Sequence, residues 1–143
     1  MDSRARVMVG PKFREALGND FTITLSELGC VTIFPKAAWE AFTERIWEKD
    51  DFSTSRELLE RHFIGYAEEE QNLDSQGRLV IPKALRDKAQ LSGEVLQIGH
   101  SGRLHLWNPD EYDKYELAMD SYGGERRLRL EQARIRVFGE EAQ

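Results

Sequence analysis

A duplicated turn–strand–helix segment constrains the fold of this chain more than any other feature of its sequence. In residues 73–89, apolar positions alternate as in a short strand, after a turn-forming run and before a helical run. Asp74 can bond its own backbone two residues on, and Gly77 can adopt a positive φ without steric cost. Pro82 has no N–H for a strand ladder and suits the start of a helix. The segment therefore predicts a tight turn, a strand and a helix in succession.

The same succession begins at the N-terminus, 72 positions earlier, where Asp2 corresponds to Asp74 and Arg6 to Arg78. Beyond the helix the correspondence continues in order: residues 21–25 match 95–98, residues 30–34 match 103–107, and Trp39 and Phe42 match Tyr112 and Tyr115. A repeat of this length predicts two copies of one supersecondary unit. We therefore expect an α+β fold, mainly β, made of two β-β-α-β-β units with flanking helices.

The predicted organisation has four parts. They are a first repeat at residues 1–47, a linking helix at 48–63, a second repeat at 64–120 and a charged tail at 121–143. The tail contains five arginines among acids, with apolar residues at helical spacing. This pattern fits either a docking helix or a partly disordered arm.

The first repeat departs from the second in three ways. Only Met1 precedes Asp2, whereas residues 64–73 form a predicted strand ahead of the second turn. Either the true start lies upstream of Met1, or the first half of the chain is degenerate. Ala5 stands where the second turn has its glycine, which would strain a turn that needs a positive φ. Gly10 stands where the second repeat has its proline.

The charge of the chain is unevenly distributed. Its net charge of −6 and pI near 5.2 argue against a simple cationic nucleic-acid binder. Residues 40–72 hold ten acids and four bases, whereas residues 73–90 hold four bases and two acids, and residues 1–20 hold four bases and three acids. The repeated turns are thus locally basic, and a locally positive face can bind DNA on an acidic protein.

The sequence contains none of the common catalytic or cofactor motifs, and His100 and His105 lack partners at metal-ligand spacing. Cys30 is the single cysteine and lies in an apolar strand, so we expect a buried structural thiol in a reducing cytoplasm. No apolar run approaches the roughly 20 residues of a membrane-spanning helix, and no signal peptide is visible. We expect no enzyme activity, cofactor, metal, membrane association or small-molecule ligand.

The turn aspartates have a simpler role than acid–base catalysis. Each can hold its turn, or bond the arginine four residues later and fix the direction of the guanidinium. Around the second turn, Arg78, Lys83 and Arg86 project near the turn and the helix start. Arginines can pair bidentately with guanine O6 and N7, or bond phosphates without sequence preference.

The two D-x-x-x-R turns, with I-P-K-x-L-R after the second, resemble the MraZ family of bacterial transcriptional regulators over residues 2–120. The resemblance implies two SpoVT/AbrB-type repeats in an interlocked swapped-hairpin barrel, and a ring-like homo-oligomer with the linking helices outside. It also implies binding to double-stranded DNA at short G-rich direct repeats near cell-division and cell-wall genes. Since each turn offers few contacts, an oligomer would raise avidity.

Matching the family's binding face residue by residue places six cations on the DNA side: Arg6, Lys12, Arg14, Arg78, Lys83 and Arg86. Asp2, Asp74 and Gly77 would brace the turns, with Arg4 and Gln76 as neighbours. Contact by the first repeat is expected to be less secure than contact by the second. The expected function is a sequence-specific regulator, most simply a repressor, on the nucleoid. The alternatives are an AbrB-type antitoxin that represses its own operon, and an oligomeric scaffold that has lost DNA binding.

Overall fold

The computed structural model describes residues 1–49, 53–120 and 125–139. The chain divides into two units, Met1–Pro109 and Asp110–Gln143. The fold is α+β, as predicted, but helical residues outnumber strand residues among those described, so the expectation of a mainly β fold is wrong. The reason is that two segments outside the repeated motif are helical, namely the segment that links the repeats and the C-terminal tail, while several strands have only three or four residues.

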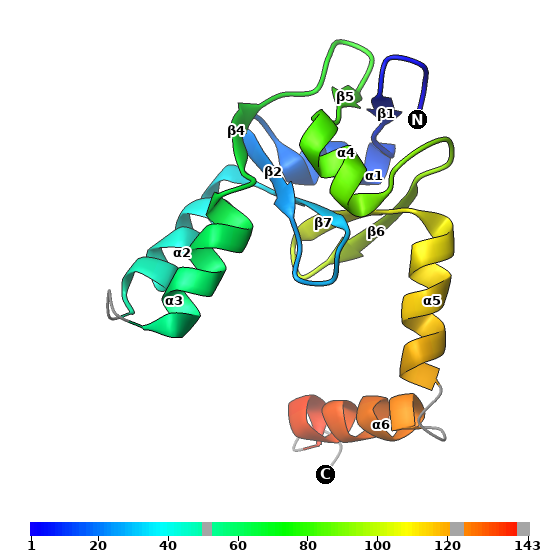
Figure 1. Ribbon diagram of the computed structural model, residues 1–143. Helices are drawn as coiled ribbons and strands as arrows, with labels where there is room; N and C mark the ends of the chain where they lie inside the picture. Colours follow the sequence, from blue (N-terminus) through cyan, green and yellow to red (C-terminus); the bar gives the residue numbers. More distant parts are fainter. Residues whose placement is uncertain (50–52, 121–124, 140–143) are drawn as a thin grey trace. The chain divides into compact units, whose positions relative to one another are not determined.

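The first unit contains the first repeat and the second repeat up to Pro109 (Figure 1). Its elements are β1 (Arg6–Met8), α1 (Pro11–Leu17), β2 (Phe21–Leu25), β3 (Val31–Phe34), α2 (Lys36–Trp47), α3 (Thr54–Leu59), the π-helical turn η1 (Glu60–Ile64), β4 (Glu68–Gln71), β5 (Arg78–Val80), α4 (Lys83–Ala89), β6 (Leu96–His100) and β7 (Arg103–Trp107). Helix α5 (Pro109–Asp120) begins at the boundary, and α6 (Glu125–Phe138) follows in the second unit. The tail is thus helical where it is described. No helix in the described ranges has the length and apolar character needed to cross a membrane.

The strands form two antiparallel sheets that interleave the repeats. The larger sheet has the order β4-β2-β3-β7-β6, and the smaller sheet is the β1-β5 pair, which we call the ribbon. In the larger sheet, β3 of the first repeat pairs with β7 of the second, and β4, which leads into the second turn, pairs with β2. Within the described residues the larger sheet is open at β4 and β6, so no closed barrel is formed.

A shared core lies between the ribbon, the larger sheet and the two short helices. Strand β2 is buried on both faces, and Leu17 of α1 and Leu85 of α4 belong to the same buried cluster as its apolar residues. A second cluster joins α2 to the end of the linking segment, through Phe34, Trp39, Phe42 and Phe63, whose rings meet at centroid distances of 4.8–5.9 Å. The aromatic residues of α2 therefore serve packing, because Phe34, Trp39 and Phe42 contact one another and Phe42 also contacts Phe63.

The predicted strand at residues 64–73 is only partly formed. Helical backbone continues through η1 to Ile64, and Gly65 also has helical dihedral angles, so pairing begins only at Glu68. Two of the stretches that correspond between the repeats, 21–25 and 103–107, are strands along their whole length, and a helix begins at Pro109.

His105 lies in the middle of β7 and is buried, 3% exposed. Burial lowers its pKa to about 4, with smaller contributions from the nearby charges of His100 and Arg103. Its Nε2 has no hydrogen-bond partner in the described part of the chain. The imidazole is therefore neutral at pH 7, and in the folded protein it cannot take up the proton that an unfolded histidine accepts.

We predict that this histidine makes the fold acid-sensitive. Its folded pKa lies below its unfolded value, so the unfolded state binds more protons between about pH 6.5 and pH 4, and stability falls as pH falls through that window. Urea unfolding at pH 7 and pH 5 should differ by about 1 kcal/mol from this group, after allowance for solvent screening. His105→Leu should remove that difference, whereas His100→Leu, at an exposed position that makes only a smaller contribution to the pKa of His105, should retain most of it. Equal pH dependence in the wild type and His105→Leu would contradict the assignment.

Candidate nucleic-acid interface

The ribbon presents one face to the core and one face to solvent. Its register pairs Arg6 with Val80, Val7 with Leu79, and Met8 with Arg78. Val7 and Leu79 are buried, and strand side chains alternate between faces, so the other four side chains point outward. Two arginines and two apolar side chains thus share one outward face, each arginine opposite an apolar residue.

An aspartate holds the first turn and its arginine together. Oδ1 of Asp2 accepts hydrogen bonds from the backbone N–H groups of Arg4 and Arg6, both at 2.9 Å. Oδ2 accepts a third hydrogen bond from Nε of Arg6 at 2.7 Å. One carboxylate therefore fixes both the backbone of the turn and the direction of a guanidinium, because its two oxygens serve the two parts separately.

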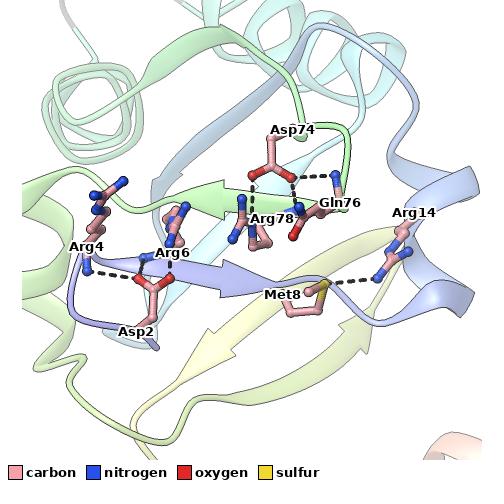
Figure 2. Close-up of polar contacts among 8 residues, drawn as sticks. All are labelled: Asp2, Arg4, Arg6, Met8, Arg14, Asp74, Gln76 and Arg78. Atoms are coloured by element: carbon pink, nitrogen blue, oxygen red, sulfur yellow. Dashed lines mark hydrogen bonds and ion pairs between the residues drawn. The ribbon is translucent and has the colours of Figure 1, made fainter.

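The second turn repeats this arrangement (Figure 2). Oδ1 of Asp74 accepts from the backbone N–H groups of Gln76 at 2.8 Å and Arg78 at 2.9 Å, and Oδ2 accepts from Nε of Arg78 at 2.8 Å. The backbone hydrogen bonds between the two repeats are reciprocal as well. The N–H of Val9 donates to the carbonyl of Gly77, and the N–H of Ile81 donates to the carbonyl of Ala5. The two turns therefore support each other across the ribbon.

We call the ion pairs Asp2–Arg6 and Asp74–Arg78 the braces, and each brace leaves part of its guanidinium available for a ligand. The pKa of Asp2 and the pKa of Asp74 are lowered, chiefly by the backbone N–H groups of Arg6 and Arg78, so both carboxylates are ionised at neutral pH. Among the described residues each brace engages only Nε of its arginine, and each arginine side chain is 25% exposed. The two Nη groups of each guanidinium can therefore make further hydrogen bonds.

Arg14 packs against the second turn. Gly77 has φ +80, and a Cβ added to it would lie 2.5 Å from Nε of Arg14. Arg14 donates from Nε to the carbonyl of Val9 at 2.8 Å and from Nη2 to Sδ of Met8 at 3.2 Å. The glycine is thus needed for its dihedral angle and for the space that the guanidinium fills.

The equivalent site in the first repeat is imperfect. Ala5 has φ +60, so the first turn adopts the same left-handed conformation with an alanine. Arg86 is the counterpart of Arg14, but its Nε is buried without a hydrogen-bond partner within the described residues.

The two predicted lysines flank the ribbon on the exposed starts of α1 and α4. Nζ of Lys12 lies 4.9 Å from the centroid of the Phe13 ring. Nζ of Lys83, a side chain 79% exposed, pairs with Asp87 at 2.8 Å. Both long side chains are solvated, which suits phosphate contacts better than base contacts.

Sequence reasoning missed Gln97 on β6. Its Oε1 accepts from the N–H of Gly10 at 2.9 Å, and its Nε2 donates to the carbonyl of Met8 at 2.7 Å. The bond to Gly10 explains why this position differs from Pro82, since a proline has no N–H to donate. No local pattern could have identified a glutamine that acts on a strand almost 90 positions earlier.

Two other kinds of site, a metal site and a nucleophilic cysteine, are not supported by the described residues. They contain no group of three or more histidine, cysteine, aspartate or glutamate side chains placed to hold a metal ion. Cys30 is buried, with Sγ 3.0 Å from Oγ of Ser26, and burial raises the pKa of its thiol to about 11. The thiol is therefore protonated at neutral pH and is a weak nucleophile.

Comparison with known proteins gives one consistent result. The family model described as "MraZ protein, putative antitoxin-like" matches residues 1–62 and again residues 65–126, one match for each repeat. The "Transcriptional regulator MraZ" of Natranaerobius thermophilus is 34% identical over 121 residues, which is 85% of this chain and 84% of that protein. Proteins of the same name from Carboxydothermus hydrogenoformans and Clostridium acetobutylicum are 34% and 30% identical, each over 80% of both chains.

The two turns should respond differently to substitution at equivalent positions. Gly77→Ala combines a left-handed alanine with a clash against Arg14, so we expect a loss of at least about 2 kcal/mol of unfolding free energy. Ala5→Gly relieves backbone strain, but it removes a buried methyl group and makes the unfolded chain more flexible. Because these effects oppose each other, we expect the free energy of unfolding to change by no more than about 1 kcal/mol. Urea unfolding of both variants provides the comparison, and equal losses would contradict the asymmetry.

Proposed function

The chain belongs to the MraZ family, and we propose that it is a sequence-specific, DNA-binding regulator of transcription, most simply a repressor. The observation that carries this proposal is the pair of aspartate-braced arginines, Arg6 and Arg78, on one outward face of the ribbon. The names of the relatives, which describe transcriptional regulators, support regulation in preference to catalysis.

The ribbon has a shape that suits the major groove. That groove admits a two-stranded β-ribbon, and an arginine can pair bidentately with guanine O6 and N7 there. Arg6 and Arg78 are diagonal neighbours in the register, and such pairs have side chains about 7–8 Å apart. Since bases rise about 3.4 Å per step, the two arginines would read guanines about two steps apart.

The remaining predicted cations would position the ribbon on the backbone. Lys12 and Lys83 stand at the exposed helix starts beside it, where they would bond phosphates. Arg14 and Arg86 are half-buried, and Arg14 packs against the second turn, so we assign both to support of the braced arginines as well as to the edge of the interface. Asp2, Asp74 and Gly77 fix the turns from which the arginines project.

We further propose that the protein acts as a ring-like homo-oligomer in which the interleaved repeats complete a swapped-hairpin barrel. Each repeat offers few base contacts, so several copies on short repeated sites would raise affinity without new contacts. Apolar side chains exposed on α2 and α3, including Trp47 and Leu58, support a subunit contact by the linking segment. G-rich direct repeats near cell-division and cell-wall genes, on the nucleoid, are the proposed targets.

An antitoxin that represses its own operon is the second candidate, favoured by the wording of the matching family description. It would also use the ribbon on DNA, but it would require a toxin partner. Co-expression with the products of neighbouring genes distinguishes the two, because an antitoxin should co-purify with one of them and relieve its toxicity.

We predict that Arg78→Ala and Arg6→Ala each weaken binding to a duplex selected from a random library by about tenfold to a hundredfold, with relaxed preference at one guanine. Fluorescence titration at several salt concentrations measures the affinity and its salt dependence. The matched control is Arg61→Ala, an exposed arginine on η1 paired with Glu57, which should bind like the wild type.

Size-exclusion chromatography of the same variants should show an unchanged assembly. Unchanged DNA affinity in both ribbon variants would reject the proposed function, and so would an equal loss in Arg61→Ala.

A further inference from the structure

The outward face of the ribbon carries two exposed apolar side chains that are not part of the hydrophobic core formed by the described residues. Met8 is 49% exposed and Val80 is 56% exposed, on strands whose inward residues already fill the core. Each lies directly opposite an arginine, so the face alternates between a guanidinium and an apolar group along both strands. An exposed apolar group at the centre of a charged face commonly marks a contact surface.

We propose that Met8 and Val80 determine sequence specificity by contacting the C5-methyl groups of thymines next to the guanines read by Arg78 and Arg6. The inference rests on the proposed function and deepens it. In the major groove the thymine methyl is the apolar group that a side chain can recognise, and apolar side chains recognise it by direct contact.

The spacing of the ribbon fits this assignment. Neighbouring strands lie about 4.8 Å apart, and residues two apart on one strand are separated by about 6.7 Å. The four outward side chains therefore cover a patch about two base steps long at 3.4 Å per step. An apolar residue opposite an arginine would thus meet a base pair adjacent to the one that the arginine reads.

The two apolar residues differ in stiffness. Val80 is β-branched and has restricted χ1 rotation, so its methyl groups are held in place. Met8 is flexible, but its Sδ accepts the hydrogen bond from Nη2 of Arg14, which holds the side chain near the second turn (Figure 2). We expect Val80 to give the sharper preference and Met8 to depend on Arg14.

A subunit contact would be a poor use of the same face. Covering Met8 and Val80 with a second copy would also cover the Nη groups of Arg6 and Arg78, and burying a guanidinium without acceptors is costly. DNA presents hydrogen-bond acceptors and thymine methyl groups side by side, so it can contact both the guanidinium groups and the apolar side chains of the ribbon.

The test uses the full chain and a duplex selected from a randomised library by the wild-type protein. Each thymine is then replaced singly by deoxyuridine, which removes only the methyl group. The wild type should lose about fourfold in affinity at two thymines beside essential guanines. Val80→Ala should abolish the preference for thymine over deoxyuridine at one of them, and Met8→Ala should abolish it at the other. Leu117→Ala, at an exposed apolar residue on α5 to which no contact is assigned, should keep both preferences.

Three results would overturn the inference. The first is DNA binding that depends on Arg78 but is indifferent to every thymine methyl, and this result leaves the proposed function standing. The second is an unchanged thymine preference in both ribbon variants, with or without a change in oligomer size. The third is no DNA binding by the wild type, which would remove the proposed function as well.

Discussion

A carboxylate that bonds a turn and a guanidinium at once is the interaction on which this structure depends. In each repeat one oxygen of the aspartate holds two backbone N–H groups, while the other oxygen holds Nε of the arginine. In each repeat the conformation of the turn and the direction of the arginine are therefore fixed by the same three hydrogen bonds. An arginine held in this way loses less conformational freedom on binding than a free side chain would, since part of its ordering is already complete.

Because the motif is duplicated, two braced arginines lie together on one surface. The ribbon joins the two turns through reciprocal backbone bonds, and the register places both arginines on its outward face. The copies are nonetheless unequal. Gly77 leaves room for Arg14, whereas Ala5 holds a left-handed conformation, and Nε of Arg86 has no hydrogen-bond partner among the described residues. The second turn is thus formed with less backbone strain than the first.

Local signals in the sequence predicted the parts of the fold that depend on local chemistry. The turns were recognisable because Asp74 and Gly77 have roles that few other residues can fill, and the strand after the second turn because apolar positions alternate along it. Contacts between distant residues could not be predicted. Gln97 bridges to β1, Arg14 fills the space over Gly77, and His105 lies buried in a sheet whose strand order was unknown. The expectation of a mainly β fold failed because helical segments lie outside the repeated motif.

The most direct measurement of the central claim is the DNA affinity of Asp74→Asn. An asparagine oxygen can still accept from the backbone of the turn, but the amide has no second oxygen and no charge to hold Nε of Arg78. Coulomb attraction alone predicts tighter binding, because a negative charge is removed beside a polyanion. If the brace aims the arginine, affinity for the selected duplex should instead fall by about tenfold, with the unfolding midpoint showing that the protein is folded. Binding that is unchanged or tighter in the folded variant would contradict the account.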